Sequence, residues 1–172
     1  MDTIRLYGLA AESIVDGKGY RAVIFTQGCP HRCEGCHNPE SHDPNGGTVW
    51  TINDVAERFL HNPLLEGITL SGGEPFAQPA ACAELARRAH ARGLTVWTYS
   101  GYTLEQLFQL AKSSADIHAL LSETDVLIDG PFLLAERSLS LRYRGSKNQR
   151  LIDMHKTRAQ GEVVLWEAEN WL

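Results

Sequence analysis

The sequence predicts an α/β fold in which outer helices cover a mostly parallel sheet. Short apolar, β-branched segments alternate with amphipathic helical segments along most of the chain. Strands connected through helices usually pair in parallel, by right-handed crossovers. The glycine-rich joints at residues 16–20, 44–47 and 71–75 are too short to be interdomain linkers. Because 172 residues is an ordinary length for one domain, residues 1–172 are expected to form a single domain.

The first strand and helix of this alternation flank a loop rich in cysteine. Residues 21–28 (RAVIFTQG) are apolar and β-branched, which predicts a buried strand. Residues 51–62 are expected to form a helix, because Thr51 suits the N-cap and Asp54 the first turn.

The next pair is a strand and an alanine-rich helix. Residues 67–73 (GITLSGG) predict a short strand that ends on glycines. Residues 78–92 predict a helix that Gly93 closes. Cys82 lies within this helix and is interpreted as a small buried residue of its apolar face.

A third repeat of the pattern follows before the chain becomes less regular. Residues 94–101 and 124–132 predict buried strands, and residues 103–113 predict a helix with Thr103 and Gln106 in capping-box spacing. The tail is expected to add two closing strands, within 142–154 and 162–171, and the four tryptophans are expected to pack in the core.

Composition and charge exclude several classes of function. The net charge of −5 argues against nonspecific nucleic-acid binding. The sequence has no run of about 18 apolar residues, so no membrane span is expected. The first ten residues lack the basic leader and apolar core of a signal peptide, so a cytoplasmic protein is expected. Thiols stay reduced there, and clustered cysteines are more often metal ligands or redox groups than disulfides.

The segment GCPHRCEGCHN, residues 28–38, places Cys29, Cys33 and Cys36 in a C-x₃-C-x₂-C pattern. Two metal centres fit it. Structural zinc needs a fourth ligand, for which His31 is sterically easier than His37. A four-iron cluster usually takes four thiolates, so three would leave one iron open to a substrate or cofactor.

A second motif, SGGEP at residues 71–75, favours the cluster. Gly72 and Gly73 end a predicted strand and allow a ligand to approach the backbone, and Glu74 is expected to present its carboxylate at the same rim. Active sites of such folds lie at the carboxyl ends of the strands. The cysteine loop, SGGEP, YSGY at 99–102 and DGPF at 129–132 all follow predicted strands, so they are expected to converge. A zinc knuckle gives no reason for SGGEP.

Together, GCPHRCEGC and SGGEP resemble the radical S-adenosylmethionine (radical SAM) superfamily, whose fold is a partial (β/α) barrel. The resemblance implies a [4Fe–4S] cluster with three protein ligands, and SAM on its fourth iron. The implied cluster ligands are Cys29, Cys33 and Cys36, and the implied SAM contacts are Gly72, Gly73 and Glu74. The sequence departs from the family where an aromatic residue often precedes the third cysteine, because Gly35 stands there. Backbone groups of Gly35, Cys36 and His37 are then expected to meet the adenine.

A narrower resemblance covers most of residues 13–152. The segments SIVDGKGYRAVIFTQGC, VWTYSGY, DVLIDGPF and RYRGSKNQRLID are similar to the anaerobic ribonucleoside-triphosphate reductase-activating proteins. This resemblance implies an oxidoreductase that generates a glycyl radical on the large reductase subunit, with flavodoxin or ferredoxin as electron donor. CHN at residues 36–38 also resembles pyruvate formate-lyase activators.

Three alternatives stay open: activation of another glycyl-radical enzyme, a small radical SAM synthase, and a non-catalytic zinc-binding adaptor. Secondary candidates for contact with SAM, the partner or the edge of the site are Asp16, Gly17, Gly19, Tyr99, Asp129, Arg142, Arg144 and Lys147.

Overall fold

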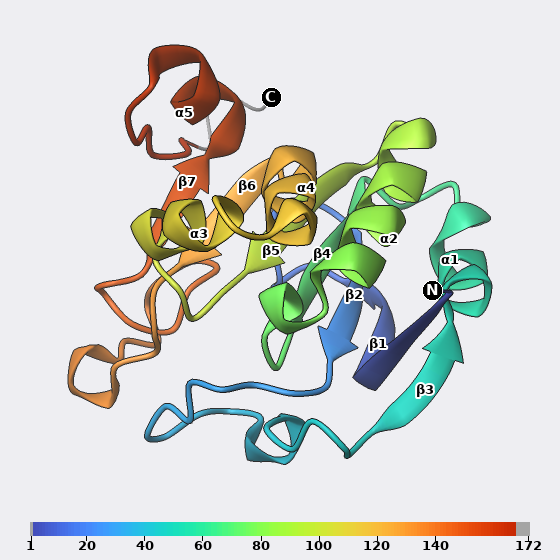
Figure 1. Cartoon of the computed structure of the whole chain (residues 1–172), viewed down its shortest axis with the longest axis horizontal. Helices are drawn as coiled ribbons and strands as arrows, with labels where there is room; N and C mark the ends of the chain where they lie inside the picture. The colour runs from blue at the N-terminus through green and yellow to red at the C-terminus, as the bar shows by residue number, and fades with distance from the viewer. Residues whose placement is uncertain (1, 168–172) are drawn as a thin grey trace.

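The computed structural model describes residues 2–167, which form a seven-stranded mixed sheet in the order β3-β1-β2-β4-β5-β6-β7 (Figure 1). Its four central strands run parallel: β2 (Arg21–Thr26), β4 (Gly67–Gly72), β5 (Thr95–Tyr99) and β6 (Val126–Asp129). All four were predicted from apolar, β-branched segments. The sheet is open, since its first and last strands do not pair with each other.

Antiparallel strands complete both edges of the sheet. On one side β1 (Thr3–Ser13) pairs with β2, and β3 (Thr48–Thr51) pairs with β1. On the other side β7 (Arg150–Asp153) pairs with β6. The sequence reasoning missed β1 and β3. The sheet is therefore mixed, with its parallel strands in the middle, where both faces are covered.

Of the two closing strands predicted for the chain's tail, the first is present and the second does not form within the described residues. Of residues 142–154 only the last part forms a strand, and residues 142–149 are a loop. Within 162–167, Leu165 makes one isolated bridge to Ile152 and no strand forms. The remainder of the predicted strand lies outside the described residues, as does Trp171.

Four helices pack on one face of the sheet, and Figure 1 shows α2, α3 and α4 in front of the central strands. They are α1 (Ile52–Leu60), α2 (Pro79–Ala91), α3 (Leu104–Ala111) and α4 (Ala115–Glu123). The first three were predicted. The sequence reasoning missed α4.

The predicted helix caps are present. The Thr51 hydroxyl accepts a hydrogen bond from the Asp54 N–H at the start of α1, and Thr103 and Gln106 form the reciprocal capping box of α3. Beyond β7 a further helix, α5 (Met154–Gln160), was also missed. Three short 3₁₀ turns lie at Pro39–Ser41, Pro75–Ala77 and Leu134–Glu136.

The two faces of the sheet carry cores of different size. Between the sheet and the helices lies a large apolar cluster that includes Leu70, Leu85 and the fully buried Cys82, as predicted. Each such leucine contributes about 1.5–3 kcal/mol on burial. The opposite face carries a smaller cluster around Trp97, Val126 and Ile128, with partly buried Tyr99, Tyr143, Leu151 and Trp166 against it. This lighter covering leaves room for a cavity.

Candidate functional site

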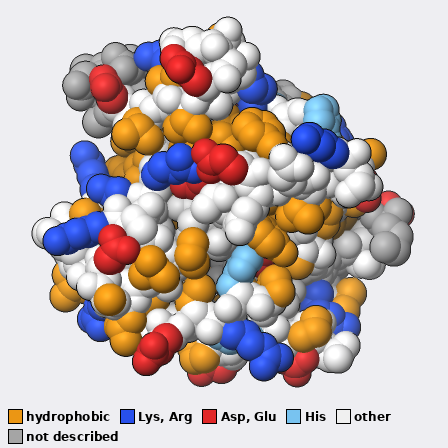
Figure 2. Space-filling view, turned by 60° about the vertical axis from the view of Figure 1, so that its left-hand side comes forward, with side chains coloured by type: hydrophobic (Ala, Val, Ile, Leu, Met, Phe, Trp, Pro, Cys, Tyr) orange, Lys and Arg blue, Asp and Glu red, His pale blue; other side chains and the backbone are white. Residues whose placement is uncertain are grey.

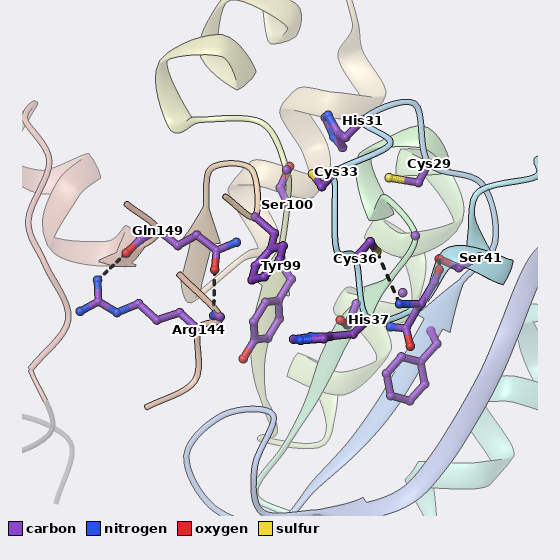
Figure 3. A pocket seen from close by; sticks show the side chains of 18 of the residues that line it. Cys29, His31, Cys33, Cys36, His37, Ser41, Tyr99, Ser100, Arg144 and Gln149 are labelled. Atoms are coloured by element: carbon purple, nitrogen blue, oxygen red, sulfur yellow. Dashed lines mark hydrogen bonds between the residues drawn. The ribbon is translucent and has the colours of Figure 1, made fainter. Parts of the chain in front are cut away.

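A cavity of about 390 Å³ opens at the carboxyl ends of the parallel strands (Figure 3). The four predicted segments all contribute to its wall, so the expectation that they converge is confirmed. The contributing residues are Cys29, His31, Cys33, Cys36, His37 and Asn38 of the cysteine loop, Ser71, Gly72 and Gly73 at the end of β4, Tyr99, Ser100 and Gly101 at the end of β5, and Gly130 and Phe132 after β6.

Backbone hydrogen bonds close the base of the cysteine loop. The Gly28 N–H donates to the Ser41 carbonyl at 2.6 Å, and the Cys29 N–H donates to the His42 carbonyl at 3.1 Å. Within the loop, Arg32 has a φ of 49°, a left-handed conformation that few non-glycine residues adopt. The loop is thus held in a specific, partly strained shape that directs its cysteines toward one cavity.

The three thiols line the same cavity but are not drawn tightly together. Cys29, Cys33 and Cys36 are free and partly exposed, and the Asn38 N–H donates to the Cys36 sulfur at 3.4 Å. Within residues 2–167, no three Cys, His, Asp or Glu side chains converge closely enough to hold a single ion. Cysteine thiolates are the usual protein ligands of iron–sulfur clusters, so the chemistry of this donor set fits a cluster.

The environment of Cys29 keeps its thiol protonated until a metal binds. Burial raises the pKa of Cys29, and the backbone N–H groups of His31 and Arg32 only partly offset that effect. Thiolates are the metal-binding form, so cluster binding would release protons at this site.

The glycines of SGGEP bring the end of β4 against the end of β2. Gly72 has a φ of 115°, and a Cβ at this position would lie 2.2 Å from the Thr26 nitrogen. The Gly73 N–H donates to the Thr26 carbonyl at 3.0 Å, and the Glu74 N–H donates to the Gly28 carbonyl at 2.8 Å. No side chain larger than hydrogen fits at Gly72, and both glycines lie on the cavity wall.

Glu74 lies differently from the sequence expectation. Its carboxylate does not face the rim, because its side chain is fully buried behind the cavity wall. One oxygen accepts from the Gly101 N–H at 2.8 Å and lies 2.6 Å from His31 Nε2. The other accepts from the Phe76 N–H, and the Ser100 hydroxyl lies 3.0 Å from both. Glu74 therefore joins the ends of three strands.

Gly35 is favoured by the turn, and it lies close to the side chains of a neighbouring loop. Its φ is 75°, and a Cβ there would lie 2.9 Å from Leu134 Cδ1 and 3.4 Å from the Phe132 ring. The Phe132 ring lines the cavity and lies 5.3 Å, centroid to centroid, from the His37 ring. Position 35 has no aromatic side chain of its own, but the Phe132 ring, from the segment after β6, lies next to it.

Sequence reasoning missed His42 and assigned Ser100 no separate role. His42 lines the cavity, and its Nε2 is buried without a hydrogen-bond partner among the described residues. A buried polar atom of this kind is normally satisfied by water or a ligand. Its signal, a histidine six residues after Cys36, is not one that a sequence pattern would single out.

Several secondary candidates lie at the site's edge, and others support the fold. Asp16, Tyr99 and Arg144 line the cavity. The Tyr99 hydroxyl donates to the Tyr143 carbonyl at 2.6 Å, and burial raises the pKa of Tyr99, so this phenol stays neutral. The Asp129 carboxylate is instead bound by the Arg150 guanidinium and the Leu104 N–H.

Members of the predicted basic cluster make contacts within their own loop. The Arg144 guanidinium donates to the carbonyls of Lys147 and Gln149, and the Arg142 guanidinium lies over the Tyr143 ring. Figure 2 shows basic, acidic and apolar side chains interspersed over one face of the molecule. Of the two glycines at the first joint, Gly17 packs against Arg21 and Trp97, and Gly19 lies against Glu66.

Comparison with known proteins agrees with the site. Residues 15–152 match the family model described as a 4Fe-4S single cluster domain, so the chain is a member of this iron–sulfur family. Three relatives narrow the assignment: a bacteriophage T4 protein, 34% identical (80% of this chain, 86% of its own), one from Haemophilus influenzae, 33% identical (79%, 89%), and one from Escherichia coli K12, 32% identical (79%, 90%). Each is an anaerobic ribonucleoside-triphosphate reductase-activating protein. The chain belongs to that family.

A solved structure resembles part of this chain. The crystal structure of QueE from Escherichia coli resembles 59% of this chain and 53% of its own, with a TM-score of 0.45 and 15% identity, a likeness too slight to assign anything. None of the helices in residues 2–167 has the length and apolar character needed to cross a membrane.

Proposed function

We propose that this protein activates an anaerobic ribonucleoside-triphosphate reductase by generating a glycyl radical on it, as a radical SAM enzyme. The observation that carries the proposal is the shared cavity, which the three cysteines line together with Gly72 and Gly73. The names of the relatives supply the reductase as the partner. In this proposal residues 1–172 form one radical SAM domain, with a partial (β/α) barrel of which the open sheet is the core.

Cys29, Cys33 and Cys36 would hold the [4Fe–4S] cluster as thiolates and leave one iron for SAM. When bound, the reduced cluster would supply one electron to the SAM sulfonium, releasing methionine and a 5′-deoxyadenosyl radical that removes a hydrogen atom from a backbone glycine of the partner. The protein's own part is to bind, orient and shield these groups.

Different segments of the cavity wall are proposed to contact different parts of SAM. The backbone of Gly72 and Gly73 is uncovered at the wall, so it can approach the methionyl end, with Glu74 fixing that segment from behind. The backbone at Gly35, Cys36 and His37 would meet the adenine, next to the Phe132 ring. Aromatic faces of this kind stack on bases.

The partner and electron donor are proposed from the family. A reductase loop carrying the glycine would enter the open cavity, and flavodoxin or ferredoxin would reduce the cluster. The work is proposed to take place in the cytoplasm, with no nucleic acid or membrane as a partner. Reduced thiols there remain available for cluster assembly.

Anaerobic EPR spectroscopy tests the proposal in two steps. The reconstituted, reduced protein should show a [4Fe–4S] signal that changes shape when SAM is added. With the reductase of the same source present, a glycyl-radical signal should then appear on the reductase, in step with methionine release. Zinc in place of iron would contradict the cluster. A cluster that responds to SAM but forms no radical on the reductase would contradict the partner.

A further inference from the structure

His31 is fixed in the middle of the cysteine loop, between the first two cysteines. Its side chain is only 15% exposed, and its ring meets the Tyr102 ring edge-on, with centroids 4.5 Å apart. The ring also covers Gly101 so closely that a Cβ there would lie 2.4 Å from it. A solvated loop histidine does not have such contacts on two sides.

The polar end of His31 reaches the buried Glu74. His31 Nε2 lies 2.6 Å from Glu74 Oε1, and Glu74 has no exposed surface. Among residues 2–167, His31 is the one histidine or basic side chain that contacts this carboxylate, whose other contacts are backbone N–H groups and the Ser100 hydroxyl. A buried charge-assisted hydrogen bond of this kind is strong, and it is costly to break on one side only.

The bond joins two segments with different proposed tasks. The backbone bonds of Gly73 and Glu74 hold only the beginning of the cysteine loop, at Thr26 and Gly28. His31 adds a link further along, beside Cys29 and Cys33. With that link the position of the cysteines is tied to the position of the Gly72–Gly73 backbone on the cavity wall.

We propose that His31 is a positioning residue that sets the cysteine loop against the Gly72–Gly73 segment, through Glu74, so that cluster and SAM are held at the correct separation. The inference rests on the proposed function. It attributes no ligand or proton-transfer role to His31, and it differs from the zinc interpretation, in which His31 would be a metal ligand. Without His31 the three cysteines remain, so cluster assembly should persist while the response to SAM weakens.

The test compares His31→Ala, His31→Gln, Glu74→Gln and the double variant His31→Ala/Glu74→Gln with the wild type. A matched control is His61→Ala, which removes an exposed histidine whose ring lies 2.8 Å from Glu57, within α1. Each protein is reconstituted anaerobically and measured for iron content, melting temperature and the SAM concentration that gives half of the EPR change.

We expect His31→Ala to keep most of its iron while needing roughly ten- to a hundredfold more SAM, from the strength of a hydrogen bond to a charged group. The Gln side chain of His31→Gln has an N–H donor of similar reach toward Glu74 and should recover part of that loss. Because the two side chains act as one link, the double variant should be no worse than His31→Ala. The control should match the wild type.

An unchanged SAM titration in His31→Ala, or full additivity in the double variant, would overturn the inference. If His31→Ala fails to take up iron, Glu74→Gln decides: a weakened SAM response with normal iron supports the inference, and a normal response overturns it. A wild-type cluster that ignores SAM would instead overturn the proposed function and this inference with it.

Discussion

At the amino end of the sheet the buried polar groups bind one another, whereas at the carboxyl end several of them face an open cavity. The fully buried Arg21 donates five hydrogen bonds, to Lys18, Ile68, Thr69 and Thr95, and lies over the Trp97 ring. Burial lowers its pKa to about 10, and it remains a cation near neutral pH.

The carboxyl end has a different balance. Three free thiols lie at the cavity there, together with His42 Nε2, which has no hydrogen-bond partner among residues 2–167, although Glu74 behind the wall is fully bonded. Satisfied polar groups stabilise one fold, and unsatisfied ones are kept where a bound group completes them. The amino end of the sheet therefore contributes stability, and the carboxyl end carries the candidate functional site.

The largest effect should come from removing a thiol at the working end. Cys33→Ala should lose its cluster and, with it, glycyl-radical formation by more than about a hundredfold, because a first ligand matters more than the outer contacts that cost 10–100-fold. Cys82→Ala is the control, since Cys82 lies in the core on α2. Iron content and EPR check both. An iron-loaded Cys33→Ala protein would break the comparison.

Thiol chemistry should divide the cysteines in the same way. Burial raises the pKa of Cys82 strongly, and its side chain has no exposed surface, while the three loop cysteines are partly exposed. In the folded, metal-free protein, iodoacetamide should modify Cys82 on the order of a hundredfold more slowly than the loop cysteines. Peptide mass spectrometry over time measures this. Equal rates would show that the core opens as readily as the loop.

A pair of glycines sharpens the comparison on stability. Gly72 and Gly93 both have a positive φ, but a Cβ at Gly72 meets the backbone of Thr26, and one at Gly93 meets nothing within 4 Å. Gly72→Ala should lower the free energy of unfolding by roughly 3 kcal/mol, and Gly93→Ala by about 1 kcal/mol, the backbone cost alone. Urea unfolding measures both values. Equal losses would mean that the strand ends tolerate separation.

The smallest effect should be a pH dependence at the amino end. His90 contacts Glu123 through Nδ1 and Asp125 through Nε2, both at 2.8 Å. The hydrogen bond to Asp125, aided by Glu123 and opposed by burial, raises the pKa of His90. A raised pKa stabilises the fold below the unfolded value, about 6.5, and that contribution is lost as the pH rises through the folded value.

The free energy of unfolding should therefore fall modestly as the pH rises above about 6.5, and less so in His90→Gln. His155 also binds Asp125 and contacts Arg158. Replacing His155 in a separate variant separates its contribution to the pH dependence from that of His90. His61→Gln is the exposed control. A pH dependence that survives in His90→Gln would place its origin elsewhere.

Most of the parallel sheet could be predicted from sequence, because β2, β4, β5 and β6 are buried on both faces and read as apolar runs. The edge strands could not: β3 is four residues long and largely exposed. In β1 the buried Ile4 and Leu6 alternate with more exposed residues, a period-two signal that was available but not used.

The site could be predicted as a meeting of motifs but not in its internal bonds. Chain order placed the cysteine loop and SGGEP at one edge, because parallel strands share a carboxyl end. The burial of Glu74, its bond to His31 and the place of Phe132 depend on contacts between groups that are 27 or more residues apart in the chain. No local pattern encodes such contacts.

The close approach of Gly35 to Leu134 also makes these two positions a single volume shared between two loops. A bulkier residue before the third cysteine can be accommodated if the Leu134 side chain rotates away, if the residue opposite becomes smaller, or if its loop moves outward. Among relatives of similar backbone, side-chain size at these two positions should therefore vary inversely. A substitution harmful alone at either position should then be tolerated with its counterpart.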